Sequence, residues 1–137
     1  MKIEVLPAGM EEEAVSLWHI TGIVRPWNDP GEDLRRAMRG TASTVLACTE
    51  RNELLGTAMV GHDGHRGWVY YLAVAPAHQQ QGVGRRLMEA CEEWVRDRGV
   101  PKIQVMIRRS NTNVFGFYQR LGYADDEVSV VSLRLDK

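Results

Sequence analysis

The chain has 137 residues, enough for a single domain with one sizeable hydrophobic core. Its formal charge of −1 excludes the broad electrostatic attraction that draws proteins to nucleic acids or anionic membranes. The apolar runs are far shorter than the roughly 20 residues of a membrane span, and the N-terminus lacks the apolar stretch of a secretory signal, so we expect a cytoplasmic protein.

The first half of the chain predicts one strand and two helices, followed by three antiparallel strands. The second helix has Asp29 as its N-cap and Pro30 at its first helical position. The Asp63-Gly64 pair lies between two strand-like runs and is typical of a two-residue hairpin turn. The expected elements are a strand over 2–6, helices over 10–21 and 30–40, and strands over 44–49, 54–61 and 66–74.

The second half predicts a helix over 82–98, a strand over 102–107, a helix over 111–121 and a final strand over 128–135. The order is therefore β-α-α-β-β-β-α-β-α-β. Three consecutive antiparallel strands followed by a βαβ crossover predict an α/β (α+β) fold, with a mixed, mostly antiparallel sheet and helices on both faces. Cys48 and Cys91 lie in apolar runs, and we expect both to be buried free thiols.

The segment Gln79-Gln80-Gln81-Gly82-Val83-Gly84-Arg85-Arg86 joins the fourth strand to the following helix. The first N–H groups of a helix lack intrahelical partners and attract an anion. Gly82 and Gly84 allow a ligand to approach that backbone closely. The segment lacks the Gly-Lys-Ser/Thr of a Walker loop, and Leu87 replaces the third glycine of a dinucleotide fingerprint. Two interpretations follow: a pyrophosphate site, or an ordinary helix start with flexible glycines.

This order of elements, with Gln79-x-x-Gly82-x-Gly84 after the fourth strand, resembles the GNAT superfamily of acetyl-coenzyme A-dependent N-acetyltransferases. A second family signature is matched by Asn111, three residues before Val114, followed by Phe117-Tyr118-Gln119-Arg120-Leu121-Gly122-Tyr123. The resemblance covers nearly the whole chain as one domain over 1–137. The segments 25–30 and 63–67 also look like the small bacterial YpeA-type members.

The resemblance implies a role for each matching position. Backbone groups of 72–74 would pair with the pantetheine arm of the coenzyme, and amides of 81–86 would hold its pyrophosphate. Asn111 would contact the coenzyme near the pantetheine, and Tyr118 would point at the thioester sulfur. The residues expected at the coenzyme are Leu72, Ala73, Val74, Gln79, Gln80, Gln81, Gly82, Val83, Gly84, Arg85, Arg86, Asn111 and Tyr118.

The chemistry of acetyl transfer suggests what these groups would do. A backbone N–H near Ala73 or Val74 would stabilise the developing oxyanion, and Tyr118 would protonate the departing sulfur. Many family members carry a glutamate base near the start of the fourth strand, but here Trp68 stands in that area and no carboxylate follows it up to Val74. The alternatives for a base are His62, Asp63 or His65 on the hairpin, or water alone. His62 and His65 make a poor metal site, and none is expected.

The resemblance implies a small-molecule or peptide amine as acceptor, and its contacts are expected in the segment 20–29. Arg25 with Trp27 would suit a carboxylate or a peptide end, and packing of Trp27 over the core is the competing interpretation. Tyr70 and Tyr71 are expected on opposite faces of the strand, so that one lines the acceptor cleft. A homodimer paired through the final strand is left open. A non-catalytic acyl-coenzyme A binding or sensor module is the alternative function.

Overall fold

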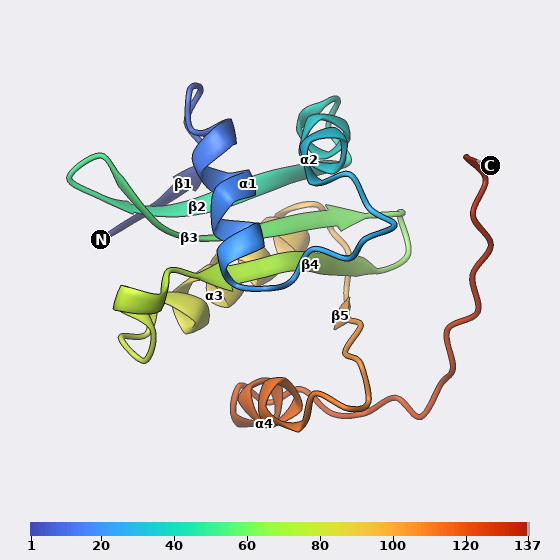
Figure 1. The fold of residues 1–137 in the computed structure, drawn as a ribbon. Coiled ribbons are helices and arrows are strands. Elements are labelled where there is room, and N and C mark those ends of the chain that lie inside the picture. The colour runs from blue at the N-terminus through green and yellow to red at the C-terminus, as the bar shows by residue number, and fades with distance from the viewer. Residues whose placement is uncertain (137) are drawn as a thin grey trace. The chain divides into compact units, whose positions relative to one another are not determined.

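A five-stranded sheet with the strands in sequence order forms the centre of the first part of the chain. The computed structural model describes residues 1–136 (Figure 1). The chain divides into two units, Met1–Met106 and Ile107–Lys137. Neighbouring strands are antiparallel except for the last pair, which is parallel. The strands are β1 (Lys2–Val5), β2 (Ser43–Glu50), β3 (Glu53–His62), β4 (Gly67–Val74) and β5 (Ile103–Val105).

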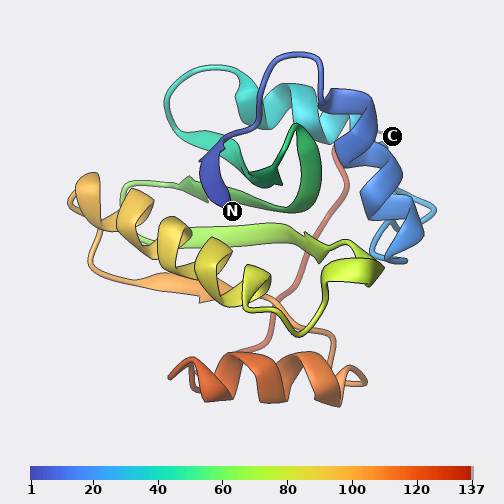
Figure 2. The same cartoon turned by 90° about the vertical axis from the view of Figure 1, so that its left-hand side faces the viewer.

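Helices cover both faces of this sheet, as the sequence predicts. Helices α1 (Glu11–Ile20) and α2 (Pro30–Met38) lie on one face, and α3 (Val83–Asp97) lies on the other (Figures 1 and 2). Thr57 of β3 contacts α1 through the indole N–H of Trp18. The preceding residue, Gly56, faces α3, because a Cβ built there would lie 3.0 Å from Val83 Cγ1. The mixed α/β architecture is thereby confirmed.

Two glycines allow α3 to approach the sheet closely. A Cβ at Gly56 would also stand 2.8 Å from the carbonyl oxygen of Ala73, and one at Gly67 would stand 2.5 Å from Cγ2 of Val95. Real Cβ atoms do not approach other atoms this closely. These two positions therefore need glycine so that α3 can pack against β3 and β4.

Local sequence signals explain where most elements begin and end. Asp29 caps α2, and its Oδ1 accepts a hydrogen bond from the Glu32 N–H at 3.2 Å, with Pro30 as the first helical residue. Arg51 and Asn52 adopt φ +51° and +63° between β2 and β3, as a tight hairpin turn requires. The β3–β4 connection is closed by a hydrogen bond from the Asp63 N–H to the Arg66 carbonyl at 3.2 Å.

The second unit contains helix α4 (Thr112–Arg120) and the segment that follows it. The Asn111 side chain caps α4 by accepting a hydrogen bond from the Val114 N–H at 3.3 Å. The Tyr118 ring contacts the rings of Phe117 and Tyr123 at centroid distances of 5.1 and 5.4 Å.

The final strand expected over 128–135 is wrong, because residues 124–136 form no strand. The alternation of this segment is real, but a strand forms only where a neighbouring strand accepts its hydrogen bonds. The described part of its own unit contains one helix and no strand for it to pair with. Helix α3 and strand β5 are slightly shorter than the predicted ranges 82–98 and 102–107. None of the described helices is long and apolar enough to cross a membrane.

Candidate functional site

Strand β4 contains a β-bulge in its second half. The register between β3 and β4 shifts by one residue between Thr57 and Met59 of β3, so β4 spends one more residue there than its partner. Tyr71 lies at this point and adopts φ +52°, in the left-handed region. The bulge immediately precedes Leu72, Ala73 and Val74, which were predicted to meet the pantetheine arm.

The bulge changes where the two neighbouring tyrosines point. Tyr70 stands opposite Met59, while Tyr71 stacks on Trp18 of α1 with ring centroids 4.0 Å apart. Met59 and Tyr71 both pack against the core cluster formed with α1 and α2. The expectation that the two tyrosines face opposite sides of the sheet is wrong, because the extra residue interrupts the alternation. Tyr70 is 42% exposed on that face.

The second half of β4 has an open edge. Strand β5 pairs with Gly67, Trp68 and Val69 only, and no strand of the described chain pairs with 70–74 on that side. The pairing therefore ends just before the bulge. An open strand edge presents unpaired backbone N–H and carbonyl groups, which an extended ligand containing amides can use.

The alternation of backbone groups shows which of them face this edge. The Ala75 N–H donates to the Leu55 carbonyl at 2.8 Å, on the β3 side. The backbone groups of Val74 consequently point to the opposite edge, and Gln79 Nε2 donates to the Val74 carbonyl there at 3.2 Å. By the same alternation Leu72 presents its groups to the open edge, and Ala73 directs its groups toward β3.

Helix α3 begins with unpaired backbone donors. Gly82 is its N-cap at φ +82°, and no side chain forms a capping hydrogen bond. The first helical hydrogen bond runs from the Arg86 N–H to the Gly82 carbonyl at 3.0 Å. The N–H groups of Val83, Gly84 and Arg85 therefore have no acceptor within the helix. The first turns of α1 and α2 contain carboxylates, whereas that of α3 contains none. This helix start is suited to an external anion.

The loop before α3 is polar and exposed. Gln80 adopts φ +63°, and Gln81 Nε2 donates to the Ala77 carbonyl at 3.5 Å. The turn follows the 3-10 helix η1 (Pro76–His78). Val83 and Gly84 are buried against the core, while Arg85 and Arg86 are exposed. The Arg86 guanidinium donates to the Met1 carbonyl at 3.4 Å.

The remaining predicted coenzyme contacts, Asn111 and Tyr118, belong to the second unit. Both residues lie on α4 or at its cap, seven positions apart, which places them about two helical turns from each other. Asn111 is exposed and its carbonyl oxygen caps the helix. Tyr118 is 6% exposed. The described chain contains both predicted groups of contacts, one in each unit.

Two of the three hairpin side chains considered as bases, Asp63 and His62, are engaged in the turn itself. Asp63 Oδ1 accepts from the N–H groups of His65 and Arg66 at 2.9 and 2.8 Å. These backbone donors, that of Arg66 first, hold the pKa of Asp63 below its usual range. His62 Nδ1 accepts from the Gly64 N–H at 3.1 Å. Through these contacts, the side chains of Asp63 and His62 stabilise the turn.

The α1–α2 connection, in which the sequence predicts the acceptor contacts, contains Arg25 and Trp27. The Asn28 N–H donates to the Arg25 carbonyl at 3.0 Å, which makes this part of the connection a tight turn. Trp27 is 51% exposed, so core packing does not account for its ring. A shallow hollow of about 600 Å³ lies elsewhere on the first unit, against α2, and none of the predicted site residues lines it.

Sequence reasoning missed the bulge and the residues that hold it. Thr57 is fully buried, and so is Trp18. A buried threonine in an apolar strand is a weak signal for a polar role, because β-branched residues are common in strands anyway.

Among the described residues, no group of three or more His, Cys, Asp or Glu side chains is arranged to hold a metal ion.

Comparison with known proteins identifies the family. Residues 11–123 match the model of the "Acetyltransferase (GNAT) family". Solved structures with the same fold include AAC(6')-Iy in complex with the bisubstrate analog CoA-S-monomethyl-acetylneamine, at 16% identity, TM-score 0.82 and 97% coverage of each chain.

Two further structures illustrate the spread of this fold. An aminoglycoside acetyltransferase, meta-AAC0020 from an uncultured soil metagenomic sample, crystallised with sisomicin, is 18% identical at TM-score 0.79, covering 98% of this chain and 96% of that one. A transcriptional regulator from Bacillus halodurans is 15% identical at TM-score 0.83, covering 98% of this chain and 99% of that one. Identities this low establish the shared fold alone.

Proposed function

Because the chain belongs to the acetyltransferase (GNAT) family, we propose that it transfers acetyl from acetyl-coenzyme A to a primary amine by direct attack in a ternary complex. The observation that carries this proposal is the start of α3. It combines unpaired N–H groups, no capping side chain and no carboxylate in the first turn. Such a helix start, placed directly after an open strand edge, suits a ligand that joins a pyrophosphate to an amide-containing arm.

The donor would be held by backbone groups more than by side chains. The N–H groups of Val83, Gly84 and Arg85 would bind the pyrophosphate, and the Arg85 and Arg86 guanidinium groups would add charge. Leu72 and Val74, whose backbone groups face the open edge, would pair with the pantetheine amides. Gln79 holds the Val74 carbonyl at 3.2 Å and so fixes the junction between the two binding segments. Asn111 would contact the coenzyme from α4.

The transfer step follows from these roles. The amine nitrogen forms a bond to the thioester carbonyl carbon, and the carbon–sulfur bond breaks as the thiolate leaves. The Leu72 N–H, next to Ala73 and farther along β4 from the pyrophosphate than Val74, would stabilise the oxyanion, a contribution of roughly 3 kcal/mol in comparable sites. Tyr118 would give its proton to the departing sulfur, since a phenol remains protonated at neutral pH. Both units of the chain would then form one acetyltransferase domain, and the family match includes residues of both.

The acceptor would approach from the α1–α2 face. Arg25, Trp27 and Tyr70 present polar and aromatic groups there, which suits a small-molecule or peptide amine with further polar groups. Two of the structural neighbours, AAC(6')-Iy and meta-AAC0020, are aminoglycoside acetyltransferases by name, and this supports a small polyamine-like acceptor as the first class to test. Because Asp63 and His62 serve the turn, water or His65 would remove the proton from an acceptor of low pKa.

The alternative is a non-catalytic module that binds acyl-coenzyme A. The observation that favours it is the absence of a carboxylate in the sequence of β4, Gly67–Val74. A titration with coenzyme A, followed by a thiol-release assay on a panel of amines, peptides and aminoglycosides, separates the two. Turnover with any amine supports the enzyme. Tight coenzyme binding without turnover on the whole panel supports the module, and absence of coenzyme binding contradicts both.

A further inference from the structure

Tyr71 holds a backbone conformation that its side chain disfavours. At φ +52° it lies in the left-handed region, where a residue with a Cβ and an aromatic ring is seldom found. Such a conformation persists when its surroundings hold it in place, and it is concentrated at functional sites. Here it forms the bulge that immediately precedes Leu72 and Val74.

A buried hydrogen-bond chain fixes the carbonyl group of this residue. Thr57 Oγ1 donates to the Tyr71 carbonyl at 3.0 Å, and the same oxygen accepts the Trp18 indole N–H at 2.8 Å. Thr57 and Trp18 are both 0% exposed. The Trp18 and Tyr71 rings stack at 4.0 Å with an interplanar angle of 17°. The bulge is therefore held by contacts among three side chains, those of Trp18, Thr57 and Tyr71, and the Tyr71 carbonyl.

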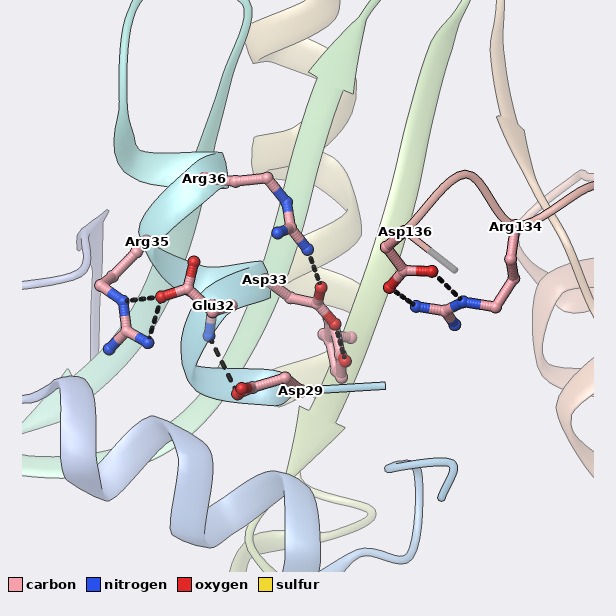
Figure 3. A network of polar contacts seen from close by, with 8 residues as sticks. Asp29, Glu32, Asp33, Arg35, Arg36, Arg134 and Asp136 are labelled. Atoms are coloured by element: carbon pink, nitrogen blue, oxygen red, sulfur yellow. Dashed lines mark hydrogen bonds and ion pairs between the residues drawn. The ribbon is translucent and has the colours of Figure 1, made fainter. Parts of the chain in front are cut away.

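The far end of the Tyr71 side chain is anchored as well. Its hydroxyl donates to Asp33 Oδ2 at 2.7 Å. The other carboxylate oxygen of Asp33 pairs with Arg36 (Figure 3). Burial, together with the Asp33 carboxylate, raises the pKa of Tyr71, so the phenol remains a donor through neutral and mildly alkaline pH. Glu32 on the same helix pairs instead with Arg35.

We propose that Thr57 is a positioning residue for coenzyme binding: its buried hydroxyl fixes the Tyr71 bulge, and the bulge presents the Leu72 and Val74 backbone to the pantetheine arm. The inference rests on the proposed function. Neither Thr57 nor Asp33 is assigned any contact with the coenzyme, so both act through Tyr71. The same hydroxyl also accepts the buried Trp18 indole N–H, and valine has nearly the same shape and strand preference but can make neither hydrogen bond.

The test compares two ligands on the full chain. Coenzyme A contains both the pyrophosphate and the pantetheine arm, whereas adenosine 3′-phosphate 5′-diphosphate keeps the nucleotide and the pyrophosphate but lacks the pantetheine arm. Thr57→Val should weaken coenzyme A binding by about ten-fold, because small misplacements of binding groups carry large penalties. Its affinity for the shorter ligand should stay within about two-fold, because the α3 start is untouched. Thr57→Ser keeps the hydroxyl and should restore coenzyme A binding.

Matched variants separate positioning from stability. Among the described residues, Thr49 of β2 is the other buried threonine, and its hydroxyl donates to Glu4 Oε2 of β1 at 2.8 Å, so Thr49→Val should leave both affinities unchanged. If Thr57→Val does not fold, Asp33→Ala provides a second test. It removes the hydrogen-bond acceptor of the Tyr71 hydroxyl on α2, and Glu32→Ala on the same helix is its control. Asp33→Ala should weaken coenzyme A binding selectively, and Glu32→Ala should not.

The outcomes are distinct. Wild-type protein that binds coenzyme A, with Thr57→Val or Asp33→Ala binding it equally well, overturns the positioning role and leaves the proposed function intact. Equal weakening of both ligands by these variants also overturns it, because the effect would then be a general loss of structure. Wild-type protein that binds neither ligand contradicts the proposed function itself.

Discussion

Tyr118 is the residue on which the proposed chemistry depends most directly. It is 6% exposed, and its ring packs edge-on against Phe117 and Tyr123. Tyr118→Phe keeps this ring packing and removes only the hydroxyl, so turnover should fall by about 100-fold, within the usual range for loss of a general acid. Steady-state kinetics at saturating amine, beside a coenzyme A titration, provides the measurement. An unchanged turnover number would remove Tyr118 as the acid.

The protein's own thiols, Cys48 and Cys91, could add to the signal of an assay that counts released thiol. Cys48 and Cys91 are both 0% exposed and unpaired by disulfides. Burial raises the pKa of both thiols, that of Cys91 to about 12. We expect neither to react quickly with a thiol reagent in the native protein, and both to react once the chain is denatured. Rapid labelling of native protein would show that one of these side chains becomes exposed.

The start of α3 is the element on which the proposed binding of acetyl-coenzyme A depends. Arg85 is the third residue of this helix and contributes both a backbone N–H and a guanidinium group. Arg85→Ala removes the charge alone, whereas Arg85→Pro also removes an N–H that precedes the first intrahelical hydrogen bond. Gly84 is buried, so a bulky substitution there would disturb packing as well.

If backbone donors hold the pyrophosphate, Arg85→Pro should weaken coenzyme A binding by at least about five-fold more than Arg85→Ala does, as expected for loss of a hydrogen bond to a charged group. Calorimetric titration of the two variants, with circular dichroism to compare helix content, provides the measurement. Equal affinities in the two variants would show that the guanidinium, and not the α3 backbone, does the binding.

At this scale the sequence predicted what depends on local signals. The Asp29 cap, the Gly82 start of α3 and the Asn111 cap of α4 are all recognisable from neighbouring residues. The bulge at Tyr71 was not predictable in this way, because the register of β4 depends on its contacts with Thr57 and α1. The strand over 128–135 failed for the same reason, since alternation alone supplies no pairing partner.

At the scale of the whole molecule, the segment after α4 leaves apolar side chains exposed. Val131, Leu133 and Leu135 are 92%, 83% and 88% exposed. Extended apolar segments without a strand partner tend to pair with another chain. We therefore expect a homodimer in sedimentation velocity experiments, and a monomer for the Val131→Lys/Leu133→Lys variant. A monomeric wild-type protein at the same concentration would contradict this expectation.

The family match and the α3–β4 geometry together lead to one claim, that this chain moves an acetyl group from acetyl-coenzyme A to an amine. Mass spectrometry of the acceptor, taken from the reaction in which released thiol is also counted, tests it most directly. We expect one acetyl group added to the amine for each coenzyme A released, with little release when the amine is omitted. Thiol release without any acetylated amine, or none with any amine of the panel, would contradict it.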